Sequence, residues 1–234
     1  MNLMFYWDEE RIGFFRDAAE NSAYYRALAD RIAPSLRKTD RVLDAGCGLG
    51  YLAGEMLRYC RSVTAADCDA QAIQALRSRI GDPALHALRT DVFKMDLSAF
   101  DVIVCCRFAS TREALEMFRK SGARTLVMIK RNEWHHRISD SASLHERTAA
   151  EAIQTLEESN LRFTAEQVTL SFDQPFRSEK DAMRFFQLYS DRVDLTKQRD
   201  LLRETGNRAF PLCLPVVNSL TIFSVYRTKN RNPQ

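Results

Sequence analysis

The chain has 234 residues, 45% of them hydrophobic, and a net charge of +3, so it can bury a globular core and lacks the strong positive charge of many nucleic-acid-binding domains. Its cysteines form no CxxC pair, which argues against a zinc site or disulfide framework and favours a reducing, cytoplasmic setting. The N-terminus lacks a signal-peptide pattern and no apolar run reaches the length of a membrane span, so we expect no membrane association.

The first third of the chain predicts helices and then alternating strands and helices. Residues 1–35 predict a helix or a helix pair that Pro34 ends. Strands follow at 41–45 and 62–67, with a helix over 51–60 between them. Asp69 is placed to cap a further helix over 70–80, and Gly81 to end it. A weaker strand candidate covers 84–91.

The rest of the chain continues this alternation to about residue 170. Residues 100–106 and 125–130 are apolar enough for strands that are buried on both faces. Ser110 with Glu113, and Thr148 with Glu151, form capping-box patterns before two helices. Two last strands are expected at 167–172 and 219–227, and the intervening segment contains a predicted helix over 178–190. The pattern predicts an α/β fold with a mostly parallel, doubly wound sheet and helices on both faces.

We therefore expect a single domain with two additional parts. Residues 1–35 would form an N-terminal helical lid, 36–172 the ligand-binding core, 173–215 a helical insertion and 216–228 the last strand. Because ligands of open α/β sheets bind beyond the carboxyl ends of the strands, we expect both additional parts to fold over that edge. The alternative is that they pack against an outer face of the sheet.

The stretch "VLDAGCGLGYLA", residues 42–53, predicts the binding site. Gly46, Gly48 and Gly50 lie between a strand and a helix, where the absence of a Cβ lets a ligand approach the backbone. The part "GLGYLA" matches a dinucleotide-binding pattern, G-x-G-x-x-A. Asp44, however, would repel a pyrophosphate and suits a ligand that carries an ammonium group and a sulfonium.

With its acid-x-G-x-G-x-G motif, this stretch resembles the first motif of class I S-adenosylmethionine-dependent methyltransferases. The resemblance extends to Asp67, where the family binds the ribose hydroxyls, and to Asp91, where it faces the adenine amino group. It covers residues 40–130 well and implies a seven-stranded sheet with an antiparallel last strand. It also implies S-adenosyl-L-methionine as the cofactor. The expected cofactor-binding residues are Tyr25, Asp44, Ala45, Gly46, Cys47, Gly48, Gly50, Asp67, Cys68, Asp91, Val92, Cys106 and Arg107.

Several of these residues also have a purely structural interpretation. Asp44 could cap the turn, Asp67 could cap the next helix, and Asp91 could be an exposed loop acid. Tyr24 and Tyr25 could close over the cofactor or belong to an amphipathic helix core. The remaining candidates for the pocket or for the core are Arg107, Phe108, Arg177, Phe185, Phe186 and Tyr189.

The resemblance predicts transfer of a methyl group to an oxygen or nitrogen of a small molecule. Such transfer needs proximity and orientation rather than a metal or a catalytic triad, and the weak candidates for a general base are His135 and His136. Two expected lids favour an enclosed small acceptor over nucleic acid. The alternatives are an RNA methyltransferase, an NAD-binding oxidoreductase and a non-catalytic cofactor-binding protein.

Overall fold

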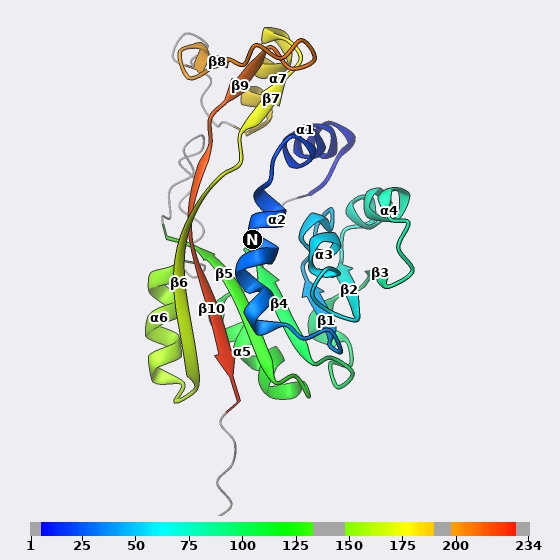
Figure 1. Cartoon of the computed structure of the whole chain (residues 1–234), viewed down its shortest axis with the longest axis vertical. Helices are drawn as coiled ribbons and strands as arrows, with labels where there is room; N and C mark the ends of the chain where they lie inside the picture. Colours follow the sequence, from blue (N-terminus) through cyan, green and yellow to red (C-terminus); the bar gives the residue numbers. More distant parts are fainter. Residues whose placement is uncertain (1–5, 133–147, 190–197, 228–234) are drawn as a thin grey trace, which may run out of the picture.

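The computed structural model describes residues 6–132, 148–189 and 198–227. Its centre is a seven-stranded sheet in the order β3-β2-β1-β4-β5-β10-β6 (Figure 1). Only β10 runs antiparallel to its neighbours β5 and β6, which confirms the predicted doubly wound sheet with an antiparallel last strand. The strands are β1 (Arg41–Ala45), β2 (Ser62–Asp67), β3 (Leu85–Arg89), β4 (Val102–Cys106), β5 (Thr125–Arg131), β6 (Arg162–Ser171) and β10 (Val217–Tyr226).

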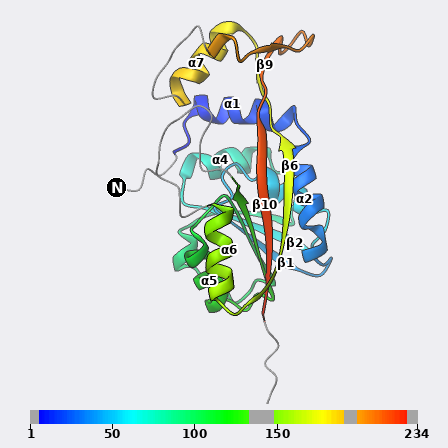
Figure 2. The same ribbon diagram turned by 90° about the vertical axis from the view of Figure 1, so that its left-hand side faces the viewer.

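Helices cover both faces of this sheet (Figures 1 and 2). One face carries α2, α3 and α4, and the other carries α5 and α6. The helices are α1 (Glu9–Glu20), α2 (Tyr24–Ile32), α3 (Tyr51–Met56), α4 (Ala70–Arg79), α5 (Thr111–Lys120), α6 (Ala149–Glu158) and α7 (Glu179–Tyr189), with short 3-10 turns η1 (Ala33–Ser35) and η2 (Val92–Lys94). None of the described helices has the length and apolar character of a membrane span.

The central strands are apolar throughout because both of their faces are buried. In β1, Val42 packs beneath α2 and α3, whereas the next residue, Leu43, packs beneath α5. The same alternation separates Ile129 from Met128 in β5. Asp44 has the parity of Val42, so its side chain lies on the face that α2 covers.

Helix ends follow the predicted caps in part. Asp69 accepts hydrogen bonds from the N–H groups of Gln71 and Ala72, and Ser110 and Glu113 form the full capping box. Thr148 caps α6, but the Glu151 carboxylate accepts a hydrogen bond from Thr111 of α5, so it ties two helices together instead of completing a box.

Two predicted helix ends were wrong. The helix expected over 51–60 ends at Met56, where the chain turns toward β2. The α4 helix ends at Arg79 with an extended Ile80, so Gly81 supplies no left-handed cap.

The segment between β6 and β10 contains strands as well as the predicted helix. Beyond the sheet edge, the β6–β10 ribbon continues as β7 (Gln174–Phe176) and β9 (Leu212–Leu214), and β9 also pairs with β8 (Arg203–Glu204). These strands are too short, and too interrupted by proline, to show an alternating pattern. We call residues 173–189 and 198–216 the arm; it projects from the sheet in Figure 1.

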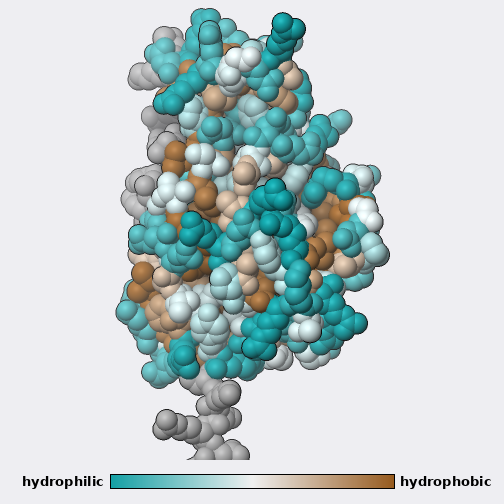
Figure 3. Space-filling view, in the orientation of Figure 1, coloured by the Kyte–Doolittle hydropathy of each residue, from teal (hydrophilic) through white to brown (hydrophobic). Residues whose placement is uncertain are grey.

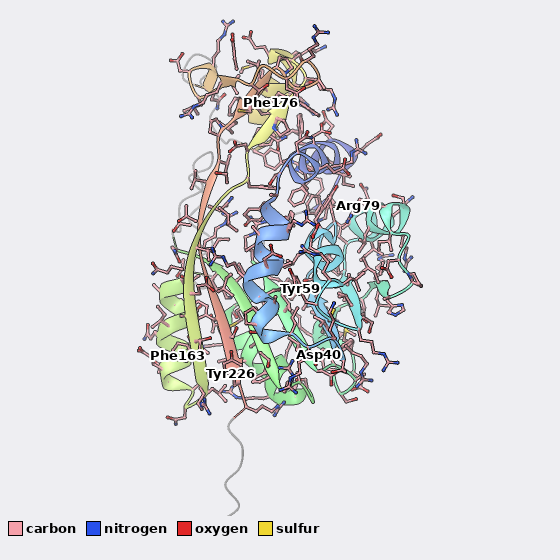
Figure 4. All side chains as sticks on the ribbon, in the orientation of Figure 1. Asp40, Tyr59, Arg79, Phe163, Phe176 and Tyr226 are labelled. Atoms are coloured by element: carbon pink, nitrogen blue, oxygen red, sulfur yellow. The ribbon has the colours of Figure 1, made fainter. Side chains whose placement is uncertain are left out.

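The arm has its own small core, which α1 completes. Phe176, Phe185 and Phe186 are buried there, and Phe14 of α1 packs on the first two with ring centroids 6.3 and 5.3 Å apart. Figure 4 shows Phe176 inside the arm and Tyr226 near the opposite end of β10. Phe185, Phe186 and Tyr189 are therefore core residues of the arm, as their alternative interpretation held.

The two additional parts thus meet each other. The α1 helix packs against β7, while α2 packs on α3 and the sheet face, which is the outer-face alternative for that helix. Figure 3 shows that the face formed by α1, α2 and the arm is mostly hydrophilic, with small hydrophobic patches.

Gly50 and Gly54, at the start of α3 and inside it, test how α3 and α4 pack against each other. Gly50 has φ +69° and a Cβ there would collide with Leu76, whereas a Cβ on Gly54, inside α3, would meet nothing within 4 Å. We expect Gly50→Ala to lower the free energy of unfolding by at least about 1–2 kcal/mol, from the left-handed conformation alone.

The matched control is Gly54→Ala, which should raise the free energy of unfolding by about 0.5–1 kcal/mol because alanine is the better helix former. Urea unfolding of both variants measures the difference. Equal effects of the two substitutions would contradict the packing described for Gly50.

Candidate functional site

The glycine turn leaves β1 in a conformation that favours glycine at three positions. Gly46, Gly48 and Gly50 have φ values of 68°, 52° and 69°. The N–H groups of Gly46 and Cys47 both donate to the Ala66 carbonyl, at 2.9 and 3.1 Å, which fastens the turn to β2. The turn is therefore rigid before any ligand arrives.

Protein side chains occupy the space beside each of these glycines. Phe108 lies against Gly46 and Leu76 against Gly50, while the Trp7 ring lies 3.2 Å from where a Cβ of Gly48 would be. Gly50 thus serves helix packing. The side of Gly48 that a ligand would approach is covered by Trp7, a residue that sequence reasoning did not identify.

Asp44 is the unusual group of this site. Its side chain is 1% exposed, and neither carboxylate oxygen has a hydrogen-bond partner among the described residues. Burial, and then the nearby charge of Asp67, raise its pKa from 3.8 to about 7. An unpaired buried carboxylate is costly, and a cationic ligand group would compensate it. Asp44 does not cap the turn, which was its structural alternative.

Asp67 links the turn to the start of α4. One carboxylate oxygen accepts a hydrogen bond from the Gly48 N–H at 2.9 Å, and the other accepts one from the Asp69 N–H at 2.9 Å. Each carboxylate oxygen can accept a further hydrogen bond, so the group remains able to receive two hydroxyls. Cys68 follows it, exposed at the same edge.

Asp91 lies at the carboxyl end of β3 in a capping position. It accepts a hydrogen bond from the Phe93 N–H at 3.1 Å and pairs with Lys94 at 3.0 Å. Lys94, and then the backbone hydrogen bond, lower its pKa. These contacts match its interpretation as a loop acid, and its role toward the cofactor stays a prediction. Val92, beside it, is buried in the sheet core.

The loop after β4 is held in a strained conformation. Arg107 and Ala109 have φ values of 53° and 58°, which is uncommon for residues other than glycine. The Arg107 N–H donates to the Ile129 carbonyl at 2.9 Å, and the buried Lys130 ammonium donates to the Ala109 carbonyl at 2.9 Å. These bonds fix Phe108 against the glycine turn. In the sequence, the charge of Lys130 at the end of the apolar run 125–130 was the feature that could have indicated this role.

Tyr24 and Tyr25 of α2 belong to an aromatic cluster above the ends of β1 and β4. Tyr25 stacks on Tyr51 with ring centroids 5.7 Å apart, and Tyr24 lies 4.8 Å from Phe172. Both are buried, and the Tyr24 hydroxyl has no hydrogen-bond partner among the described residues. Burial raises the pKa of the neighbouring Cys106 thiol, so Cys106 is a poor nucleophile.

The N-terminal segment is attached directly to this edge. The backbone N–H of Trp7 donates to the Asp69 carboxylate at 3.2 Å. The Trp7 ring meets the Phe15 ring edge-on, with ring centroids 5.1 Å apart. Arg177, by contrast, pairs with Asp17 on α1 at 2.7 Å, so it does not line the edge. His135 and His136 lie outside the described residues.

The site therefore combines a rigid glycine turn, an uncompensated carboxylate and a second carboxylate with spare acceptor capacity. These groups fit a ligand with an ammonium group and a pair of hydroxyls, and the charge of Asp44 opposes a pyrophosphate. Within the described ranges, no three histidine, cysteine or acidic side chains group as metal ligands would.

Comparison with known proteins agrees with this geometry. Residues 42–128 match the methyltransferase domain family. An uncharacterized methyltransferase of Mycobacterium tuberculosis is 35% identical over 83 residues, which are 35% of this chain and 41% of that protein. A mitochondrial ribosomal RNA small subunit methyltransferase of Arabidopsis thaliana is 27% identical over 110 residues, or 44% of this chain and 29% of that protein. The matches thus span less than half the length of these relatives.

The fold is also found in solved structures. That of a candidate methyltransferase from Bacillus halodurans superposes with a TM-score of 0.55 at 14% identity and covers 87% of this chain and 99% of that one. At this identity the likeness concerns the fold.

The raised pKa of Asp44 predicts a pH-dependent stability. Between its unfolded pKa of 3.8 and its folded pKa of about 7, the folded protein holds a proton that the unfolded chain has released, so stability falls as the pH rises. Asp44→Asn cannot titrate there. Its free energy of unfolding relative to the wild type should rise by about 3–4 kcal/mol from pH 4 to pH 8, measured by urea unfolding. Parallel pH curves for the two proteins would contradict the assigned shift.

Trp7 predicts a fluorescence response to a ligand at Gly48. Trp134→Phe leaves Trp7 as the only tryptophan, since the chain has two. Adding S-adenosylhomocysteine to this variant should change its emission in a saturable way, because the ligand must displace or cover the ring. NAD serves as the control ligand and should leave the emission unchanged. A flat titration with S-adenosylhomocysteine, at concentrations that raise the melting temperature, would show that the ligand does not reach Gly48.

Proposed function

We propose that the chain, whose residues 42–128 match the methyltransferase domain family, is a class I S-adenosylmethionine-dependent methyltransferase that transfers a methyl group from this cofactor to an oxygen or nitrogen atom of a small molecule. The observation that carries the proposal is Asp44, a buried carboxylate at the end of the central strand that forms no hydrogen bond with any described residue. It supplies the negative charge that the cofactor's ammonium needs. Asp67 would receive the ribose hydroxyls from the side of the turn.

The bound cofactor supplies a methyl group that its positively charged sulfur already activates. The protein then needs to hold the acceptor in line with the sulfur–methyl bond and to exclude water. Trp7 and Phe108 can exclude water, because they lie against Gly48 and Gly46. Proximity and orientation of this kind contribute up to about 7–11 kcal/mol in model reactions. A general base is required only where the acceptor must lose a proton.

An RNA acceptor is the second candidate, since the Arabidopsis relative is named as a ribosomal RNA methyltransferase. The charges of the arm favour the small molecule. Three arginines of the arm are paired with acids: Arg177 with Asp17, Arg184 with Glu10 and Arg199 with Glu179, at 2.7, 2.8 and 2.9 Å. Arginines that acids already neutralise present little positive charge to a phosphate backbone.

Thermal unfolding with added ligands tests the cofactor. S-adenosylmethionine and S-adenosylhomocysteine should raise the melting temperature, while NAD should not. A rise with NAD alone would support the oxidoreductase alternative and overturn the proposal.

Asp67→Ala tests the ribose contact. Loss of a charged hydrogen bond should weaken S-adenosylhomocysteine binding by roughly 1.5–3 kcal/mol, measured by calorimetry. Asp96→Ala is the matched control, because Asp96 likewise accepts the N–H of a residue two positions on, Ser98, but lies outside the site. If both variants bind like the wild type, Asp67 does not hold the ribose.

The acceptor class is tested with methyl-labelled cofactor. Incubation with separated small-molecule and RNA fractions of a cell extract should place the label in the small-molecule fraction. Label in RNA, with binding that weakens steeply as salt rises, would favour the alternative.

A further inference from the structure

Two arginines lie near each other at the carboxyl edge of the sheet and form no ion pair with the described acids. Arg107 follows β4 and Arg131 ends β5, and these strands are parallel neighbours, so both residues emerge at the carboxyl edge. Alternation along β5 places Arg131 on the face of Ile129, beneath α2, and Lys130 on the opposite face. Neither arginine forms an ion pair with an acid among the described residues.

The surroundings of the pair contain further hydrogen-bonding capacity and one described acid, Asp44, whose charge acts with the two arginines on the Cys106 thiol. Both guanidinium groups lie near Tyr24, whose side chain is 2% exposed and whose hydroxyl has no described partner. Burial, and then the charge of Arg107, lower the pKa of Arg131 to about 10, so both groups still carry charge at neutral pH. Two like charges in a partly buried site repel each other unless an anion joins them.

The backbone at Arg107 is also fixed by hydrogen bonds. Its φ of 53° is a strained conformation, and the loop is fixed by the Arg107 N–H to Ile129 and by Lys130 to Ala109. Strain of this kind persists where the surrounding structure enforces it, and it occurs often at ligand sites. The strain in the Arg107 backbone is explained if its side chain must face a ligand.

We propose that Arg107 and Arg131, with the Tyr24 hydroxyl, bind an oxyanion of the methyl acceptor, so that the substrate is a small acid that carries a carboxylate or phosphate. This inference rests on the proposed function and specifies its substrate class. Guanidinium groups match such oxyanions because their N–H donors form paired hydrogen bonds.

The cofactor's own carboxylate is the other source of an oxyanion, and its position disfavours it. It is bonded to the same carbon as the ammonium, which we place at Asp44 on β1. The sheet order β1-β4-β5 puts Arg131 two strands away, or about 10 Å, whereas Arg107 follows β4, the strand next to β1. The pKa of Asp44 is raised by burial and by Asp67, and neither arginine offsets this. For Arg131, an acceptor over β4 and β5 is therefore the nearer source of an oxyanion.

Inorganic phosphate is the probe for this site. At constant ionic strength, phosphate should raise the melting temperature of the wild type, free and with S-adenosylhomocysteine bound, more than chloride does. Arg131→Gln should weaken phosphate binding at least tenfold, Arg107→Gln should weaken it as well, and Arg131→Lys should retain part of it. The matched control is Arg112→Gln, because Arg112 is an exposed arginine on α5 and should leave the response unchanged. Far-ultraviolet circular dichroism confirms that each variant is folded.

Calorimetry separates the two sources of the oxyanion. Arg131→Gln should bind S-adenosylhomocysteine within about threefold of the wild type. A loss of tenfold or more, with unchanged binding of 5′-methylthioadenosine, which lacks the carboxylate, would assign the arginines to the cofactor and overturn the proposal. So would a phosphate response that Arg131→Gln retains, or no response in the wild type. Binding of an RNA oligonucleotide that Arg131→Gln abolishes would replace the small acid with RNA.

The methyltransferase proposal and the oxyanion site are tested by different measurements. If S-adenosylhomocysteine fails to bind the wild type, the methyltransferase proposal is lost. The phosphate titration of the free protein still tests the oxyanion site by itself.

Discussion

A buried carboxylate with no hydrogen-bond partner in the described part of the chain is the constraint on which this site depends. Asp44 is buried at the end of the central strand, close to a second acid, Asp67. A fold selected for stability alone would hydrogen-bond or replace such a group, since burying a charge without a partner is costly. The free-energy cost of burying this charge is offset by the surrounding sheet, because strands β2, β1, β4 and β5 are buried on both faces.

The glycine turn and the loop after β4 form one unit around that carboxylate. Phe108 packs on Gly46, the turn is hydrogen-bonded to Ala66 of β2, and Lys130 of β5 holds the Ala109 carbonyl. Four strands thereby fix two loops that are far apart in sequence. Rigid loops on a rigid sheet are what orientation of two reactants requires.

The N-terminal segment and the arm add a second layer above the sheet edge. The α1 helix connects them, because Phe14 enters the core of the arm while Trp7 reaches the glycine turn. Ion pairs such as Arg184 with Glu10 join the same two parts. A ligand that moves Trp7 would therefore act on a segment that the arm also holds.

The sequence by itself determined the sheet, its order of elements and the residues of the glycine turn, because these depend on local patterns. Apolar runs, caps such as Asp69 and Ser110, and left-handed glycines act over a few residues. The tertiary structure decided that Arg107 lies near Arg131, that Trp7 contacts Gly48 and that Asp44 has no hydrogen-bond partner among the residues described. Each depends on which distant segments meet at the edge of the sheet. The strands of the arm have three residues or fewer. They depend on pairing with the extended ribbon and are too short to show an alternating hydrophobic pattern in the sequence.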